Sequence, residues 1–207
     1  MRLSEKAYHL IKHQVVSLEL APGSFIDEQA LMDGLQLGRT PIREGLQRLA
    51  AEGLVSFAPR RGMYVTDISI TDLQKIFEMR LAVDGLAARL AAERITAGEL
   101  ASMEAVIADL ALVPAGEGKA LMDIDERFHT LLYQAADNKF LAESCTRLHA
   151  LSCRLWHLVL GRLGDVRDAM EQHREIMEAL KAHDGARAEA LLRTHILEFQ
   201  QRIKAVI

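Results

Sequence analysis

The chain has 207 residues, of which 50% are hydrophobic and 26% charged, a composition typical of an ordinary globular protein. It contains no apolar run of the roughly 18 residues that a membrane-spanning helix needs, and its first residues lack the apolar core of a secretory signal. These features exclude a membrane-spanning protein and predict a cytoplasmic one. The length allows two domains, each with a core of its own.

Three helices followed by a hairpin are expected at the start of the chain. Turn-forming residues at Pro22-Gly23 and Gly38 separate the helices, and two apolar segments flank a Pro-Arg-Arg-Gly turn that ends at Gly62. Three helices and a hairpin in this order are typical of a winged helix-turn-helix domain. The expected helices cover Leu3–Leu18, Asp27–Leu35 and Thr40–Glu52, and the expected hairpin covers Leu54–Thr66.

An all-helical bundle is expected in the rest of the chain, because its apolar residues recur with helical period. We assign residues 1–66 to the winged helix-turn-helix, residues 67–71 to a short linker and residues 72–207 to the bundle. The predicted fold class is therefore mainly α, with one small β-hairpin. About six helices are separated by breaks at Thr96–Gly98, Pro114–Gly118, Asp137–Asn138, Gly161–Asp165 and Asp184–Gly185.

The third helix has recognisable ends. Thr40 is expected to cap its first turn, Pro41 suits that turn, and Gly53 follows the last turn as a stop signal. One face should be buried in the core of the domain. The residues expected on that face are Ile42, Leu46, Leu49 and Ala50.

Polar residues at the start of this helix indicate a nucleic-acid contact. A recognition helix presents its N-terminal residues to the major groove, where arginine bonds guanine edges or clamps phosphates. Arg39, Thr40 and Arg43 occupy that position, and Gln47 lies one turn further on. The alternative is that they are solvated surface residues of a common three-helix packing.

The hairpin turn has the character of a wing. Arg60 and Arg61 place two cations there, and Gly62 permits a tight bend with a close approach to a sugar-phosphate wall. Together with the run Gly38–Glu44, these features resemble the DNA-binding domain of the GntR superfamily over roughly residues 5–66. The resemblance implies that the two arginines at the start of the third helix contact bases or phosphates, that the threonine between them contacts a phosphate, and that Gly62 forms the wing tip.

Four residues of the second domain form a possible metal site. Asp125 and His129 are four residues apart on an expected helix and therefore project from one face of it. His173 and His195 lie on separate later helices. Three imidazoles and a carboxylate suit a divalent first-row metal such as zinc, nickel or manganese. For each histidine alone, the alternative is a surface or packing role.

The second domain is similar to the FCD effector-binding domain of FadR-type GntR regulators, in its short six-helix form. The similarity rests on the stretch Phe77–Ala92 and on the order of the same four residues along the chain. It implies that they bind one metal ion, for which we favour zinc. It also implies that Arg80 faces an effector carboxylate, whereas the alternative is a charge on the helix surface.

A further expected helix contains both cysteines, Cys145 and Cys153. Their spacing fits neither a disulfide framework nor a CxxC motif, so we expect inert packing residues. His149 and His157 lie on either side of Cys153. We expect them to pack in the core, with pocket lining or alternative metal ligation left open.

The predicted function is that of a transcriptional repressor. A homodimer is expected to dock two recognition helices on double-stranded operator DNA, and a small carboxylate effector at the metal-containing pocket is expected to control its operator affinity. Two alternatives remain from the residues. The site could activate water in a metalloenzyme, or the metal could itself be the signal.

Overall fold

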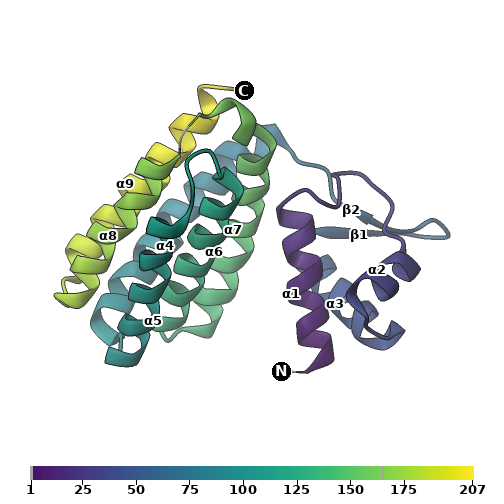
Figure 1. The fold of residues 1–207 in the computed structure, drawn as a ribbon, viewed down its shortest axis with the longest axis horizontal. Coiled ribbons are helices and arrows are strands. Elements are labelled where there is room, and N and C mark those ends of the chain that lie inside the picture. The colour runs from purple at the N-terminus through teal and green to yellow at the C-terminus, as the bar shows by residue number, and fades with distance from the viewer. Residues whose placement is uncertain (1, 165) are drawn as a thin grey trace. The chain divides into compact units, whose positions relative to one another are not determined.

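The computed structural model describes residues 2–164 and 166–207, and the chain forms two compact units that divide between Ile70 and Thr71 (Figure 1). The first residue of the predicted winged domain and the last residue of the predicted break at Gly161–Asp165 lie outside the described residues. Each unit is described separately below.

The first unit is a winged helix-turn-helix, as predicted. Its two strands pair in antiparallel register from Val55 opposite Val65 to Ala58 opposite Gly62. The elements are α1 (Leu3–Val16), α2 (Glu28–Leu35), α3 (Arg39–Ala51), β1 (Val55–Ala58) and β2 (Gly62–Val65) (Figure 1).

Local hydrogen bonds fix the ends of α2 and α3. The Asp27 carboxylate accepts from two backbone N–H groups of the first turn of α2, a standard N-cap. Gly53, with φ +78°, follows α3 in the left-handed conformation. Its N–H donates to the carbonyl of Ala50 and that of Leu54 donates to Leu49, which is the Schellman arrangement. The predicted stop of this helix is confirmed.

The predicted start of α3 was wrong by one residue. Gly38 has an extended backbone and forms the N-cap, with no side-chain hydrogen bond, and the helix begins at Arg39. Thr40 therefore lies within the first turn and cannot act as the cap. The predicted core face is correct for Ile42, Leu46 and Leu49, which are fully buried, whereas Ala50 is only partly buried.

The core of the first unit forms where α1 packs on α3. A Cβ atom added at Gly45 would lie 2.9 Å from the backbone nitrogen of Tyr8, so only glycine allows this approach. Beside it, the buried Lys12 ammonium donates to the Tyr8 hydroxyl and to Glu52, at 2.9 and 3.0 Å. The Arg48 guanidinium lies 3.8 Å from the centre of the Tyr8 ring.

The second unit is an all-helical bundle in which the long helix α4 packs against α6, α7, α8 and α9. Its described residues form six α-helices and short 3-10 turns, in agreement with the predicted number. The α-helices are α4 (Leu73–Arg94), α5 (Ala97–Ala108), α6 (Gly118–Ala135), α7 (Lys139–Val159), α8 (Arg167–Lys181) and α9 (Gly185–Lys204) (Figure 1).

Three of the five predicted breaks contain a residue whose side chain caps the next helix. Thr96 and Glu99 form a reciprocal capping box at the start of α5. Asn138 accepts from the backbone N–H of the third residue of α7, and Asp184 does the same for α9.

Trp156 packs within the bundle core. Among the residues described here, no helix is long and apolar enough to span a membrane.

Candidate nucleic-acid interface and metal centre

The exposed side of α3 carries the predicted DNA-contacting residues. Arg39, Arg43 and Gln47 are exposed at intervals of four residues, beside the stripe that contains the buried Ile42 and Leu46. Thr40 is exposed beside them. The helix thus presents its polar residues along one stripe.

One contact of this stripe was not anticipated. Arg43 Nε donates to the carboxylate of Glu28, the first residue of α2, at 2.7 Å. The Arg43 side chain nevertheless remains 55% exposed, so part of its guanidinium is accessible to a ligand. The ion pair links α2 to α3.

The end of the hairpin turn and the start of α3 line the same hollow on the first unit. Arg60 and Arg61 are exposed, and Arg60 has a positive φ of 64°. Gly62 has φ +94°, and a Cβ atom there would lie 2.8 Å from the ring of Phe25, so the position requires glycine. A hollow of about 290 Å³ is lined by residues of both parts, among them Phe25, Arg39, Arg43 and Gly62.

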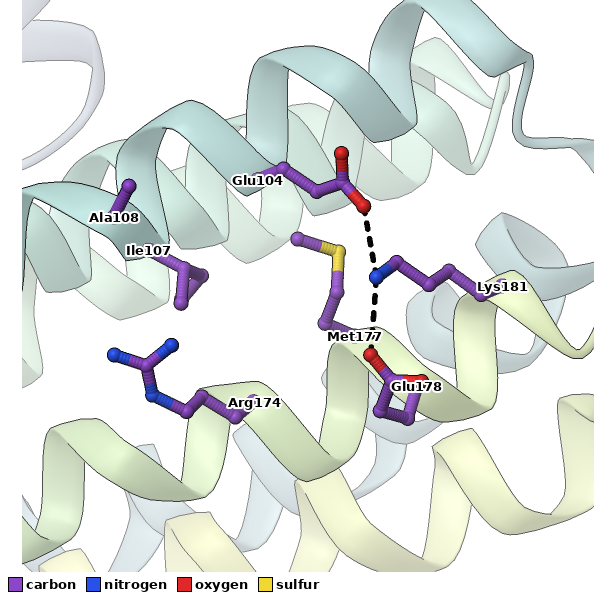
Figure 2. Close-up of a pocket in the computed structure, with 7 residues that line it drawn as sticks. All are labelled: Glu104, Ile107, Ala108, Arg174, Met177, Glu178 and Lys181. Atoms are coloured by element: carbon purple, nitrogen blue, oxygen red, sulfur yellow. Dashed lines mark hydrogen bonds and ion pairs between the residues drawn. The ribbon is translucent and has the colours of Figure 1, made fainter.

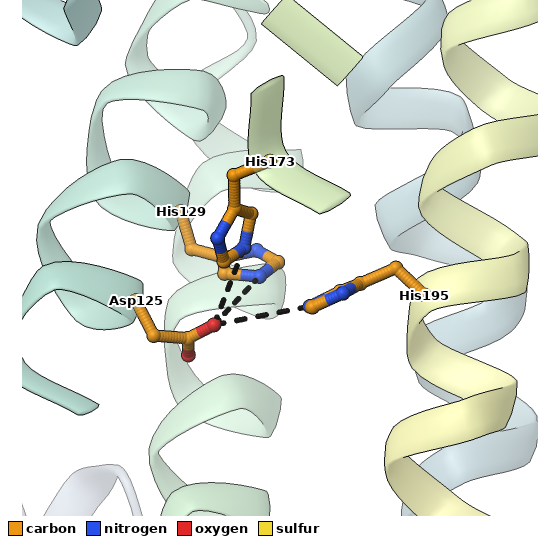
Figure 3. A group of neighbouring side chains, drawn as sticks. All are labelled: Asp125, His129, His173 and His195. Carbon is orange, nitrogen blue, oxygen red and sulfur yellow. Dashed lines mark ion pairs between the residues drawn. The ribbon is translucent and has the colours of Figure 1, made fainter. Parts of the chain in front are cut away.

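The four predicted metal ligands converge in the centre of the bundle. Asp125 and His129 come from α6, His173 from α8 and His195 from α9, and all four are buried (Figure 3). Each histidine turns its Nε2 toward Asp125 Oδ1, at 3.6 Å for His129, 3.3 Å for His173 and 3.8 Å for His195. Sequence spacing alone did not show that three helices meet there.

These distances fit a metal centre. Tetrahedral ligands with bonds of about 2.0–2.1 Å lie about 3.4 Å from one another. Asp125 Oδ1 and the Nε2 atoms of His129 and His173 are also buried without a hydrogen-bond partner within the described structure. Unpartnered buried polar atoms are costly, and a shared cation would satisfy all three. The donor set therefore suits a divalent ion.

Neighbouring groups orient two of the imidazoles for ligation. His129 Nδ1 lies 3.2 Å from the Tyr133 hydroxyl, and His195 Nδ1 lies 2.9 Å from Gln172 Oε1. Because an amide oxygen only accepts, His195 carries its proton on Nδ1 and leaves the Nε2 lone pair free. The corresponding tautomer of His129 donates to Tyr133. Such outer contacts are typical of metal-binding histidines.

The protonation states also suit ligation. Burial opposes the charged form of Asp125, but the attraction of His129 and the polar contacts of three further histidines outweigh it and hold the pKa of Asp125 well below its usual value. Burial lowers the pKa of His129 well below its usual range and that of His195 to about 4. An ionised carboxylate and neutral imidazoles are the forms that bind metals.

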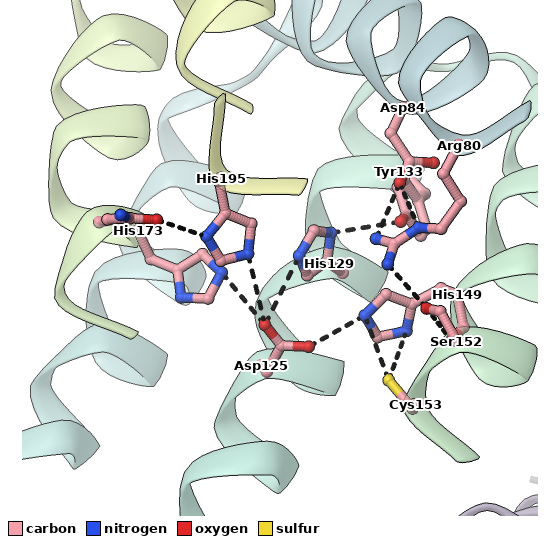
Figure 4. Close-up of polar contacts among 11 residues, drawn as sticks. Arg80, Asp84, Asp125, His129, Tyr133, His149, Ser152, Cys153, His173 and His195 are labelled. Atoms are coloured by element: carbon pink, nitrogen blue, oxygen red, sulfur yellow. Dashed lines mark hydrogen bonds and ion pairs between the residues drawn. The ribbon is translucent and has the colours of Figure 1, made fainter. Parts of the chain in front are cut away.

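Arg80 lies inside the bundle, so the alternative of a surface charge was wrong. Its side chain is buried and bonds to Asp84 Oδ2 through Nε at 2.9 Å and Nη2 at 2.8 Å (Figure 4). Its Nη1 donates to the Ser152 hydroxyl at 2.7 Å. Burial favours the neutral form, but the Asp84 carboxylate and other anionic groups prevail and raise the pKa of Arg80. Its charge in turn contributes to lowering the pKa of His129.

The sequence favoured a packing role for His149, but its side chain contacts Asp125 of the ligand cluster. Its Nε2 lies 3.0 Å from Asp125 Oδ2, the oxygen that faces away from the other three histidines (Figure 4). Cys153 lies one turn further along α7, with Sγ 3.6 Å from both ring nitrogens of His149. Cys145 is fully buried, as expected of a packing residue.

A second hollow lies on the outside of the bundle, between α5 and α8 (Figure 2). It measures about 260 Å³ and includes no predicted site residue. Lys181 Nζ lies 2.8 Å from Glu104 and 3.0 Å from Glu178. Its charges are thus paired internally, and we assign no function to it.

Comparison with known proteins agrees with both parts of this description. The FCD domain model matches residues 75–198, and the model of bacterial regulatory proteins of the gntR family matches residues 3–65. The chain belongs to the GntR family. GntR regulators bind operator DNA, so the exposed stripe of α3 lies in the domain that performs this role.

Similar proteins carry the same two-part organisation. The transcriptional repressor RspR of Escherichia coli K12 is 27% identical over 207 residues, covering 99% of this chain and 90% of that protein. LutR, a transcriptional regulator of Bacillus subtilis 168, is 26% identical over 201 residues, covering 86% and 90%. The solved structure of E. coli McbR/YncC superposes with a TM-score of 0.84 at 21% identity and covers 99% of this chain and 98% of that one. This GntR-family protein is a transcriptional regulator and not an enzyme.

Proposed function

We propose that this regulator represses transcription as a homodimer and that a small organic carboxylate, bound at a divalent metal in the bundle, controls its operator affinity. The observation that carries the proposal is the convergence of Asp125, His129, His173 and His195, four buried ligand groups from three helices. The description of RspR as a repressor supports the direction of control.

The proposed operator contacts come from α3 and the wing. Two copies of the recognition helix in a dimer would reach half-sites about one DNA turn apart. The cations of the wing would follow the backbone or enter the minor groove beside each half-site. The proposed contact residues are Arg39, Thr40, Arg43, Gln47, Arg60, Arg61 and Gly62.

In the proposed metal centre, the chain supplies one carboxylate oxygen and three imidazole nitrogens. Zinc is our first choice because its nitrogen and oxygen bond lengths match the observed separations, and nickel and manganese are the other candidates. When bound, the ion supplies a Lewis-acidic centre for an anionic ligand. His195 and His129 hold their Nε2 lone pairs toward it through their contacts with Gln172 and Tyr133.

Arg80 is the proposed second anchor for the carboxylate. Three of its five N–H groups are used by Asp84 and Ser152, so two remain for an effector oxygen. The buried guanidinium also needs no reorganisation to meet an anion. A carboxylate can pair with the metal through one oxygen and with arginine through the other.

Metal content and operator binding test the proposal together. Elemental analysis of the full chain should give about one divalent ion per chain, and His173→Ala should lose it. His9→Ala, which removes an exposed imidazole of α1, should keep it. Wild-type protein with intact DNA binding but without metal would contradict the metal centre.

Operator-fragment binding then separates the effector from the metal. Metal-loaded protein should release the fragment when a panel of short carboxylic acids is added, and Arg80→Met should respond to much higher acid concentrations only. If the acids change nothing in the loaded protein, the carboxylate proposal fails. If metal alone changes affinity, the ion is itself the signal.

A further inference from the structure

The helix α7 carries a second pair of potential ligands beside the proposed metal centre. His149 and Cys153 are four residues apart and lie on one face of α7, just as Asp125 and His129 do on the neighbouring α6. Asp125, His149 and Cys153 are all buried, and one ligand atom of each lies within 4.8 Å of the others. The two pairs face each other across the α6–α7 contact (Figure 4).

Asp125 connects the two groups through its two oxygens. Its Oδ1 faces His129, His173 and His195, whereas its Oδ2 lies 3.0 Å from His149 Nε2. A carboxylate can hold two metal ions in this way, one on each oxygen. In two-metal sites the ions lie about 3.5–4 Å apart, a separation that one bridging carboxylate spans.

The separations of the second group match a sulfur-containing metal site. With bonds of about 2.3 Å to sulfur and 2.0 Å to nitrogen, tetrahedral geometry places the two ligand atoms about 3.5 Å apart. Cys153 Sγ lies 3.6 Å from His149 Nε2. The 3.0 Å between His149 Nε2 and Asp125 Oδ2 has to widen by a few tenths of an ångström to reach the corresponding separation of about 3.4 Å.

We propose that Asp125, His149 and Cys153 form a second metal site, selective for thiophilic cations such as Cd²⁺, Zn²⁺ or Cu⁺. A thiolate ligand favours these ions over the harder manganese, whereas the neighbouring Asp and three-His set has no sulfur. The inference rests on the proposed function only in that the two sites share Asp125.

Binding at this site has a defined proton balance. The Cys153 thiol loses its proton to the solvent when sulfur bonds to the metal. His149 binds the ion through the lone pair on Nε2, with a ring proton on Nδ1. The proton that the thiol releases for each ion bound is measured in a weakly buffered indicator solution.

The test is a cadmium titration of the full chain that already holds one equivalent of zinc. Wild-type protein should reach a total of two metal ions per chain, with ultraviolet thiolate-to-cadmium absorption and one released proton. Cys153→Ser and Cys153→Ala should stop at one ion with no such absorption. Cys145→Ser removes the other buried thiol of α7, which does not belong to this group of ligand atoms, and should behave as wild type.

Three results would overturn the inference. If wild-type protein binds one ion without thiolate absorption while His173→Ala binds none, the first centre stands and His149 only orients Asp125 through a hydrogen bond. If Cys145→Ser abolishes the absorption and Cys153→Ser does not, the thiolate ligand has been misassigned. Absence of any metal in wild-type protein would reject both sites.

Discussion

Glu28 holds Arg43 by a 2.7 Å hydrogen bond between the first residue of α2 and the exposed face of α3. An arginine paired in this way has fewer directions available than a free one, because its guanidinium is planar and its donors are fixed. The pair therefore restricts the directions in which the Arg43 guanidinium can point. It also reduces the net positive charge that the surface offers to phosphates.

Glu28→Gln should remove the ion pair and free the Arg43 guanidinium. We expect tighter binding to non-specific DNA and a smaller ratio of operator to non-specific affinity, because the freed guanidinium can pair with any phosphate. Arg43→Ala should weaken operator binding by about 1–3 kcal/mol. Fluorescence anisotropy over a salt series measures both effects. Asp33→Asn makes the same charge change on α2 away from Arg43, and an equal effect there would refute a specific role for Glu28.

Gly45→Ala should destabilise the DNA-binding unit. The added methyl would lie 2.9 Å from the Tyr8 backbone nitrogen, so α1 and α3 must separate, at a cost of about 1–3 kcal/mol. Gly34→Ala is the control, because a Cβ there meets no atom within 4 Å and alanine favours a helix. Urea unfolding of the full chain should show opposite shifts for the two variants. Equal shifts would show that the close approach is unimportant.

Much of the first unit was predictable because its signals are local. The cap at Asp27 and the glycine stop at Gly53 act through residues within a few positions of each other. The start of α3 was misplaced because a threonine was expected to form the cap, whereas the extended backbone of Gly38 serves without a side-chain bond. The Arg43–Glu28 pair was missed because it joins residues of different helices.

The metal centre was predictable only in part. The spacing of Asp125 and His129 shows a shared helix face, whereas His173 and His195 were included because they lie on later helices of the same bundle, and the similarity to the FCD domain strengthened that assignment. Spacing contains no information on which separate helices meet. For the same reason the contacts of His149 were not predicted, and those of Tyr133 and Gln172 were not considered.

Tyr133→Phe should weaken metal binding. Loss of the hydroxyl 3.2 Å from His129 Nδ1 removes the group that fixes the ring and its tautomer, and outer contacts of this kind are worth about 10–100-fold in metal affinity. Competition with a chromophoric chelator measures the dissociation constant. Tyr64→Phe, in the hairpin, is the control for loss of a hydroxyl elsewhere. An unchanged constant in Tyr133→Phe would show that Tyr133 only fills space.

The metal-free protein should lose stability in mild acid. Burial lowers the pKa of His195 to about 4, below the usual 6.5, so the unfolded chain binds more protons than the folded one between these values. The contribution of this group to the free energy of unfolding is therefore fully present above pH 6.5. It decreases as the pH drops toward 4, by about 1.4 kcal/mol for each unit of pKa difference.

Thermal unfolding between pH 7.5 and 4 in the presence of a chelator measures this dependence. His195→Gln removes one of the titrating groups, beside His129, and should make the pH dependence less steep. If the variant and the wild type show parallel pH dependence, His195 does not account for the acid sensitivity.

The ligands of the proposed centre lie on α6, α8 and α9, with about 70 residues of chain between Asp125 and His195. An ion held by all of them closes this length into loops, much as a covalent cross-link would, and restricts the unfolded chain more than the folded one. Metal supply would then set how often α8 and α9 open to proteases. The cellular lifetime of the regulator, and with it the number of occupied operators, would follow the availability of the ion before any effector is bound.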